Sequence, residues 1–366
     1  MRLALAILIG IHGLIHLFGF LKAFGWAQFE AISQPVPKPH GVIWLLAFVL
    51  FLVALILFLI RHDLWWIIGM AGVVVSQVLI IIYWKDAKFG TIANLLIPAA
   101  AIVAYSTVSF RNKVDDESRS MLSQMAPSEE MILTKEMIIN LPTAVRSWLM
   151  KSGVVGKPMT YNVYLEQDLQ MKLQPDQKDW TKAKAQQYFT VDPPAFNWSV
   201  KLKMKGVLDV AGRDKFENGK GEMLIKLFSA FPVVDAKGSE KIDQAALQRY
   251  LAEIVWFPSA AVSPYIKWEE IDHMSARATL DYMGTSGSGI FHFDKDGNFE
   301  KFVAMRYKDA AATEPSEWVV RSTQTQIVNG RSTPGGAEVA WGSGDDEWIW
   351  LKLKIDHIEY NVEKSI

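Results

Sequence analysis

The segment Val42–Ile60, VIWLLAFVLFLVALILFLI, contains no charged residue. Three more apolar segments surround it, at Leu3–Phe24, Leu64–Trp84 and Thr91–Phe110. Each has about the 20 residues that an α-helix needs to cross the hydrocarbon of a bilayer. We therefore expect residues 1–110 to form a four-helix transmembrane domain and the more polar remainder to fold separately in water.

Composition narrows the classes of function. The chain has 366 residues, a formal net charge of −1 and no Cys. Without Cys there is no disulfide, no thiolate metal site and no Cys nucleophile. No run of Lys and Arg indicates a nucleic-acid partner, and no phosphate-binding loop or dinucleotide fingerprint is present. We expect no cofactor.

Four spans place the N-terminus and the soluble domain on the same side of the membrane. The distribution of positive charge does not decide which side, because each face of the predicted bundle carries four Lys or Arg. On one face these are Lys22, Lys38, Lys85 and Lys88, and on the other Arg2, Arg61, Arg111 and Lys113.

Polar residues occur inside the predicted spans. His12 and His16 are four residues apart and share one helix face with Gly19. Counted from the span ends, His16, Gln77 and Asn94 reach similar depths. We hypothesise a buried hydrogen-bonded cluster of these three residues with His12 nearby. Three roles are open for such a cluster: it holds the helices together, it binds a metal or haem, or it forms part of a proton or solute path. A metal or haem site is disfavoured because too few ligands lie at one depth.

The soluble part changes from helical to strand periodicity. Residues 111–155 predict a helical connector, with a helix beginning at Pro127–Glu130 and another at Leu141–Trp148. Alternating apolar residues and Asn-Gly or Asp-Gly pairs then predict about ten strands joined by short hairpins. One helix, Gln244–Trp256, interrupts the strands. We expect an α+β domain over residues 156–366, a strongly curved antiparallel half-barrel around a central helix.

Several strings resemble an uncharacterised bacterial family. In the soluble part they are RYLAEIVWFPSA at Arg249–Ala260, ARATL at Ala276–Leu280 and FHFDKDG at Phe291–Gly297. In the front half, IHGLIH at Ile11–His16 and WKDAKFGTIAN at Trp84–Asn94 resemble membrane members of that family. The resemblance covers nearly the whole chain and brings no established activity. It implies a soluble domain similar to LolA-type lipoprotein carriers and, by analogy with them, a multi-pass protein of the bacterial plasma membrane with that domain outside the cytoplasm.

Candidate ligand-binding residues lie on and near the predicted central helix. Arg249, Glu253 and Trp256 form one stripe because they follow at i, i+4 and i+7. This stripe is either an ordinary helix-surface ion pair beside a packed Trp or the lining of a binding site, together with Trp198 and Phe257. The acidic and His residues elsewhere lack the spacing of acid–base pairs or zinc ligands. The string Ser286–Gly289 does not have the frame of a nucleophile elbow, and we expect a flexible hairpin there.

Three functions follow from these features. The first is a membrane-anchored module that binds a lipid, a lipoprotein or another apolar ligand in the hollow of the half-barrel. The second is a structural or interaction protein whose interior is packed and which binds no ligand. The third is an enzyme on a membrane substrate, with Glu253 and Arg249 as the residues to test, although we find no catalytic motif. The sequence does not indicate an oligomeric state.

Overall fold

A computed structural model describes residues 2–125 and 131–363. The helix predicted to start at Pro127–Glu130 lies outside these residues. Contacts divide the chain into two compact units, Met1–Arg111 and Asn112–Ile366, which we call the membrane unit and the half-barrel unit.

The membrane unit consists of helices. They are α1 (Arg2–Ala23), α2 (Lys38–Leu59), α3 (Trp65–Ile82), the short α4 (Trp84–Ala87) and α5 (Gly90–Ser123), whose C-terminal end belongs to the half-barrel unit. The four long helices are long and apolar enough to cross a membrane, as the sequence predicted. Helix α5 continues past the predicted end at Phe110, and its polar part carries an i,i+4 ion pair between Lys113 and Glu117.

Close approach of α1 and α2 depends on small residues. A Cβ atom on Gly19 would lie 2.1 Å from the ring of Trp44, and a Cβ on Gly41 would lie 2.4 Å from Cβ of Ala23. Small residues at such contacts let two helix backbones approach each other inside a bilayer. The glycines therefore position α2 against the His-bearing face of α1.

The half-barrel unit contains one antiparallel sheet of thirteen strands in the order β6-β5-β4-β3-β2-β1-β13-β12-β11-β10-β9-β8-β7. The strands are β1 (Asn162–Met171), β2 (Thr181–Thr190), β3 (Ala195–Met204), β4 (Leu208–Glu217), β5 (Lys220–Leu227), β6 (Phe231–Ala236), β7 (Ile266–Asp272), β8 (Ser275–Tyr282), β9 (Thr285–Phe293), β10 (Phe299–Arg306), β11 (Ser316–Val328), β12 (Arg331–Trp341) and β13 (Trp348–Tyr360). Its helices are α6 (Lys135–Ile138), α7 (Thr143–Lys151) and α8 (Glu240–Glu253), with 3₁₀ turns at Ile254–Trp256, Pro258–Val262 and Gly344–Asp346.

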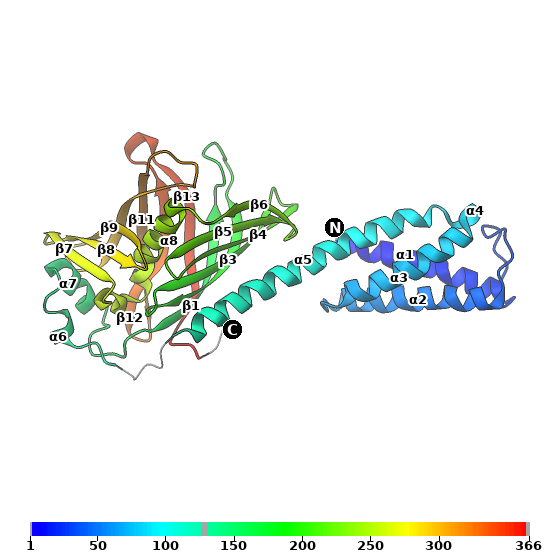
Figure 1. The fold of residues 1–366 in the computed structure, drawn as a ribbon, viewed down its shortest axis with the longest axis horizontal. Helices are drawn as coiled ribbons and strands as arrows, with labels where there is room; N and C mark the ends of the chain where they lie inside the picture. The colour runs from blue at the N-terminus through cyan, green and yellow to red at the C-terminus, as the bar shows by residue number, and fades with distance from the viewer. Residues whose placement is uncertain (1, 126–130, 364–366) are drawn as a thin grey trace. The chain divides into compact units, whose positions relative to one another are not determined.

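The sheet is curled, and α8 contacts strands toward both edges of the sheet. We call these two parts of the sheet its wings: β4 and β5 belong to one wing, and β8, β9 and β10 belong to the other. Helix α8 packs on β4 and β5 and also on β8, β9 and β10 (Figure 1). Glycines make this possible, because a Cβ on Gly221 of β5 would lie 2.5 Å from the carbonyl of Ile242. On the other wing, a Cβ on Gly287 of β9 would lie 2.8 Å from Leu247. The helix therefore rests directly on the backbone of both wings.

The two wings also touch each other. Thr285 Oγ1 donates a hydrogen bond of 2.7 Å to the carbonyl of Gly219, so that the β4–β5 turn meets the start of β9. The side chain of Asp243 on α8 fastens the same turn by accepting from the Gly221 amide at 2.8 Å and from Lys220 Nζ at 2.9 Å.

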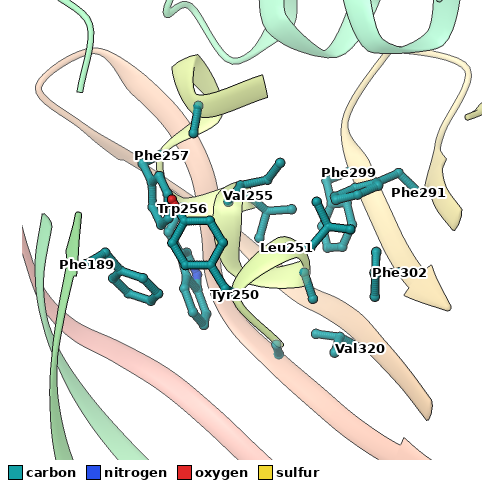
Figure 2. Close-up of a cluster of buried hydrophobic side chains, with 14 of the residues drawn as sticks. Phe189, Tyr250, Leu251, Val255, Trp256, Phe257, Phe291, Phe299, Phe302 and Val320 are labelled. Carbon is teal, nitrogen blue, oxygen red and sulfur yellow. The ribbon is translucent and has the colours of Figure 1, made fainter. Parts of the chain in front are cut away.

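The core lies between α8 and the inner face of the sheet. Figure 2 shows Tyr250, Trp256 and Phe257 facing Phe189 of β2 on one side of the helix. On the other side are Leu251 and Val255 with aromatic residues of β9 and β10. Tyr250 is 1% exposed, and Leu251 and Phe257 are 0% exposed. Side chains therefore fill the space around this part of α8.

Two expectations need correction. The sheet has thirteen strands, not about ten, because strands such as β2 and β8 carry Ala at their inner positions and lack the alternating large apolar residues. The string Ser286–Gly289 belongs to strand β9 and is not a flexible hairpin. Its glycines serve close packing: a Cβ on Gly289 would lie 2.0 Å from Phe302.

Candidate functional site

Charged and polar side chains lie on the inner face of the sheet, beside α8. Trp198 of β3 and Asp214 of β4 are paired across the two strands. Both point inward, because they alternate with the outward residues of their strands as Val200 and Phe216 do. Arg306, at the end of β10, has the parity of the inward Phe302. Inward charges on a sheet whose inner face forms the core need partners.

Arg249 on α8 joins the two carboxylates. Its Nη1 donates to Asp214 Oδ2 at 2.5 Å, and its Nε donates to Glu253 Oε1 at 3.0 Å. Gln187 of β2 donates from Nε2 to the other oxygen of Glu253 at 2.8 Å. The side chains of Arg249, Asp214 and Glu253 are 15%, 8% and 12% exposed. This is a largely buried ion triad, not a surface pair.

Aromatic rings complete the surroundings of Arg249. Its guanidinium carbon lies 5.0 Å from the ring centre of Phe196 and 4.8 Å from that of Trp198. The Trp198 indole donates from Nε1 to Gln167 Oε1 at 2.9 Å. Both distances to Arg249 are within the range of cation–π contact, so the strand residues hold the guanidinium in one orientation.

Burial and charge act in opposite directions on the triad. Burial raises the pKa of Glu253, against the attraction of Arg249. Burial likewise opposes the charge of Arg249, but Glu253 and Asp214 overcome it and raise the pKa of the guanidinium.

Arg306 lies in the same region without an acid of its own. Its Nε donates to the carbonyl of Ala245 on α8 at 2.9 Å. Its guanidinium carbon lies 4.6 Å from the ring centre of Trp318 and 5.6 Å from that of Trp341. Among the residues that the structure describes, no carboxylate forms a salt bridge with it. Burial lowers the pKa of Arg306 to about 10, so that the group remains a cation at neutral pH.

The structure brings some of the predicted ligand residues together and separates others. Arg249, Glu253 and Trp198 belong to one polar cluster. Four residues that were not predicted from the sequence also belong to it, namely Gln167, Gln187, Asp214 and Arg306. Trp256 and Phe257 lie in the apolar core, 2% and 0% exposed, where the ring of Phe257 is 4.9 Å from that of Phe189. The missed charges had a signal in the sequence: Asp214 and Arg306 occupy inward positions of strands whose other inward residues are apolar.

The four predicted polar residues of the spans also lie together. His12 Nε2 is 2.9 Å from Asn94 Oδ1, and Asn94 Nδ2 is 3.0 Å from Gln77 Oε1. Ser76, which the sequence analysis did not name, lies at the centre. Its Oγ is 2.9 Å from His16 Nε2, 3.0 Å from Asn94 Nδ2 and 3.2 Å from His12 Nε2. We call these five residues the intramembrane cluster.

The oxygen atoms that face the two imidazole rings indicate which ring nitrogens carry a proton. His16 Nδ1 is 2.8 Å from the carbonyl of His12 and must donate to it, which leaves Nε2 to accept from the Ser76 hydroxyl. His12 Nε2 must carry a proton to meet the amide oxygen of Asn94. With both imidazole rings neutral, the Ser76 hydroxyl and the side-chain amides of Asn94 and Gln77 all take part in these hydrogen bonds. Within residues 2–125 and 131–363, no group of three or more His, Asp or Glu is arranged to hold a metal ion.

Comparison with known proteins establishes the family. Residues 139–360 match a family described as a family of unknown function, DUF6920, and the chain belongs to it. The expected membership of an uncharacterised family is thus confirmed. No curated protein matches the sequence.

Two solved structures are similar to part of the chain. A DUF1329 family protein from Desulfovibrio piger aligns with 11% identity and a TM-score of 0.37, over 61% of this chain and 93% of that protein. A LolA superfamily protein from Nitrosomonas europaea aligns with 10% identity and a TM-score of 0.32, over 60% of this chain and 94% of that protein.

Proposed function

We propose that this protein is a membrane-anchored binding protein whose half-barrel unit holds an amphiphile with an anionic group. The observation that carries the proposal is Arg306. Its guanidinium is partly buried against two indole rings and has no carboxylate partner among the described residues. A buried charge without a counterion is costly, and a carboxylate or phosphate of a ligand offsets this cost by bidentate hydrogen bonding.

The apolar part of such a ligand has a surface next to the polar cluster. From Asp214 the inner face of β4 continues to Val210, which pairs with Leu202 of β3 and Leu227 of β5. Val210 and Leu227 are half-buried, unlike the residues around α8. Solvent therefore reaches the inner face at this end, and an acyl chain that covered it would remove apolar area from water.

The filled space around α8 limits where a ligand binds. Tyr250, Leu251 and Phe257 are buried between the helix and the sheet, so the proposed position is the open inner face beside β4 and β5. The same packing is the observation that favours a second candidate, an interaction protein that binds no small ligand.

We propose further that the partner is a lipid, or a lipoprotein with its acyl chain, of the bacterial plasma membrane. The membrane unit anchors the chain, and the half-barrel unit lies on the extracytoplasmic side together with the N-terminus. A periplasmically active reporter enzyme fused after Ile366 tests the side, because its activity requires export. Activity only with a reporter that works in the cytoplasm contradicts this assignment.

Ligand binding is tested on the full chain in detergent, after delipidation, with a fluorescent fatty acid. The wild type is expected to bind it, and Arg306→Gln to bind about 10- to 100-fold more weakly, the effect of losing a charge-assisted hydrogen bond of about 1.5–3 kcal/mol. The matched control is Arg277→Gln, because Arg277 is exposed on β8. A fluorescent fatty alcohol, which has no anionic group, should bind both variants alike. Failure of the delipidated wild type to bind either probe favours the interaction protein.

A further inference from the structure

The outer face of the sheet carries a groove that is rich in lysine. It has a volume of about 950 Å³ and crosses β13, β1, β2 and β3 to the start of β4. The inward residues Leu169, Ala183, Leu202 and Leu353 adjoin it, and outward side chains line the rest. They are six lysines, Lys182, Lys184, Lys201, Lys203, Lys352 and Lys354, with two acids, Asp168 and Asp209, and one amide, Gln170. We call this the lysine groove.

The register places like charges opposite each other. Lys184 of β2 is paired directly with Lys201 of β3. Lys182 and Lys203 adjoin the next pair of the same two strands, Ala183 with Leu202. Four ammonium groups thus occupy neighbouring positions of one face. Like charges directly opposite on antiparallel strands destabilise a sheet, and such a local conflict within a consistent fold is expected at functional sites.

Three of the six groove lysines form salt bridges with acids nearby, and Asp356 and Glu166 add a weaker attraction on Lys184. Lys184 pairs with Asp168 at 3.0 Å, and Lys203 pairs with Asp209 at 2.5 Å. A third groove lysine, Lys352, pairs with Glu338 at 2.7 Å. In the described part of the chain, Lys182, Lys201 and Lys354 form no salt bridge, and all three are exposed.

An indole ring lies beside the groove. The ring centre of Trp180 is 5.0 Å from Lys172 Nζ and 5.3 Å from Lys352 Nζ, so two ammonium groups contact its ring. Trp180 is half-buried in the segment between β1 and β2. Indole rings beside lysines are characteristic of surfaces that rest at the headgroup level of a bilayer.

We propose that the lysine groove binds the phosphate headgroups of an anionic bilayer. Phosphates match the uncompensated ammonium groups in charge, and each lysine near an anionic surface adds to the attraction. A bilayer is the occupant because the chain also contains four helices long and apolar enough to cross one. This proposal is independent of the ligand at Arg306, since the groove is on the opposite face of the sheet.

The test measures lysine accessibility in the full chain. The protein is reconstituted into vesicles of phosphatidylcholine alone, or of phosphatidylcholine mixed with phosphatidylglycerol. Amines are then labelled with a water-soluble acylating reagent and identified by mass spectrometry. Lys182, Lys201 and Lys354 should be labelled at least fivefold more slowly in the anionic vesicles, and high salt should abolish the difference. Lys267 on β7, whose side chain is 79% exposed, is the internal control and should not change.

Variants and added anions separate the remaining explanations. The triple variant Lys182→Gln, Lys201→Gln, Lys354→Gln should lose the protection of Lys203 and Lys352, while Lys178→Gln, Lys205→Gln, Lys237→Gln should retain it. Equal labelling of the wild type in both kinds of vesicle overturns the proposal. Protection by inorganic phosphate in neutral vesicles, without protection by phosphatidylglycerol, shows an isolated anion site and also overturns it. Protection only by an added acidic polymer assigns the groove to another macromolecule.

Discussion

Gly289 of β9 lies against Phe302 of β10 so closely that a Cβ atom on Gly289 would be 2.0 Å from Cζ of the ring. The ring is completely buried and also contacts Phe291, 4.8 Å away between ring centres. The end of the Phe302 ring therefore occupies the space that a side chain at position 289 would fill. This contact explains why a strand of the core contains a glycine that weakens it intrinsically.

Gly289→Ala should therefore destabilise the half-barrel unit. The added methyl group forces the ring of Phe302 or the backbone of β9 to move, and overpacking of this kind costs about 1–3 kcal/mol. Urea unfolding of the full chain, followed by tryptophan fluorescence, measures the loss. The control is Ser288→Ala, at the neighbouring outward position, which should be nearly neutral. An unchanged midpoint for Gly289→Ala would show that the ring moves freely.

Asp243 provides a test of how α8 is fastened to the β4–β5 turn. Asp243→Ala leaves the buried amide of Gly221 without an acceptor, at a cost of about 1–3 kcal/mol. Asp243→Asn keeps an oxygen for that amide and loses only the ion pair with Lys220, so its effect should be clearly smaller. Equal losses in the two variants would mean that the charge, not the amide bond, holds the turn. Thermal unfolding of both variants separates these outcomes.

The ion triad predicts a pH dependence. Because burial raises the pKa of Glu253 in the folded chain, the folded state holds this proton more tightly than the unfolded state. The contribution of Glu253 to stability is therefore fully present below its unfolded pKa of about 4.3 and is lost as the pH rises through the folded value. Glu253→Gln should not show this loss. Denaturant unfolding is measured from about pH 4 upward, because the unfolded pKa sets the lower end of the range. The free energy of unfolding of the wild type should fall relative to that of Glu253→Gln as the pH rises. A relative increase would contradict the raised pKa of Glu253.

Ser76 should contribute to the packing of the spans. Ser76→Ala removes the hydroxyl that His16 and Asn94 share, while the bond between His12 and Asn94 remains. Hydrogen bonds between membrane helices contribute about 1 kcal/mol, so amide exchange in α1 and α3 should accelerate about fivefold. Mass spectrometry in detergent measures this rate. Ser109→Ala, at an exposed position of α5, is the control; equal exchange in the two variants would assign Ser76 no such role.

Hairpins were more predictable than the strands they join. Asn218-Gly219 and Asn329-Gly330 mark turns in the structure because both Asn residues have positive φ, 53° and 51°, which Asn tolerates. Strand β2 gave a weak signal, because its inward residues Ala183 and Ala185 are small. A turn can be predicted from adjacent residues because their backbone preferences decide it. A small inward residue in a strand is explained by the side chain that packs against it, which comes from a distant part of the chain.

The candidate site was predictable only in part. Arg249 and Glu253 are on one helix, so their separation of four residues predicts their contact. The contact of Arg249 with Asp214 depends on how α8 packs on β4. That no described carboxylate forms a salt bridge with Arg306 depends likewise on side-chain positions in three dimensions, although Asp214 and Glu253 lie close enough to act on its charge. Trp256 shares the helical stripe of Arg249 but belongs to a 3₁₀ turn, where the change of helical period directs its ring into the core.

The sequence by itself determined the four apolar spans, the β-rich half and the turns, because each of these depends on hydrophobicity or backbone preference within a short window. Only the tertiary structure decided that α8 lies on both wings of one sheet, that Arg306 forms no salt bridge with any described carboxylate and that six lysines gather on the outer face. These features depend on contacts that no short window of sequence contains, such as the pairing of β1 with β13 and the packing of α8 on both wings. Strand register, which turns each side chain inward or outward, is a property of such pairings and not of either strand alone.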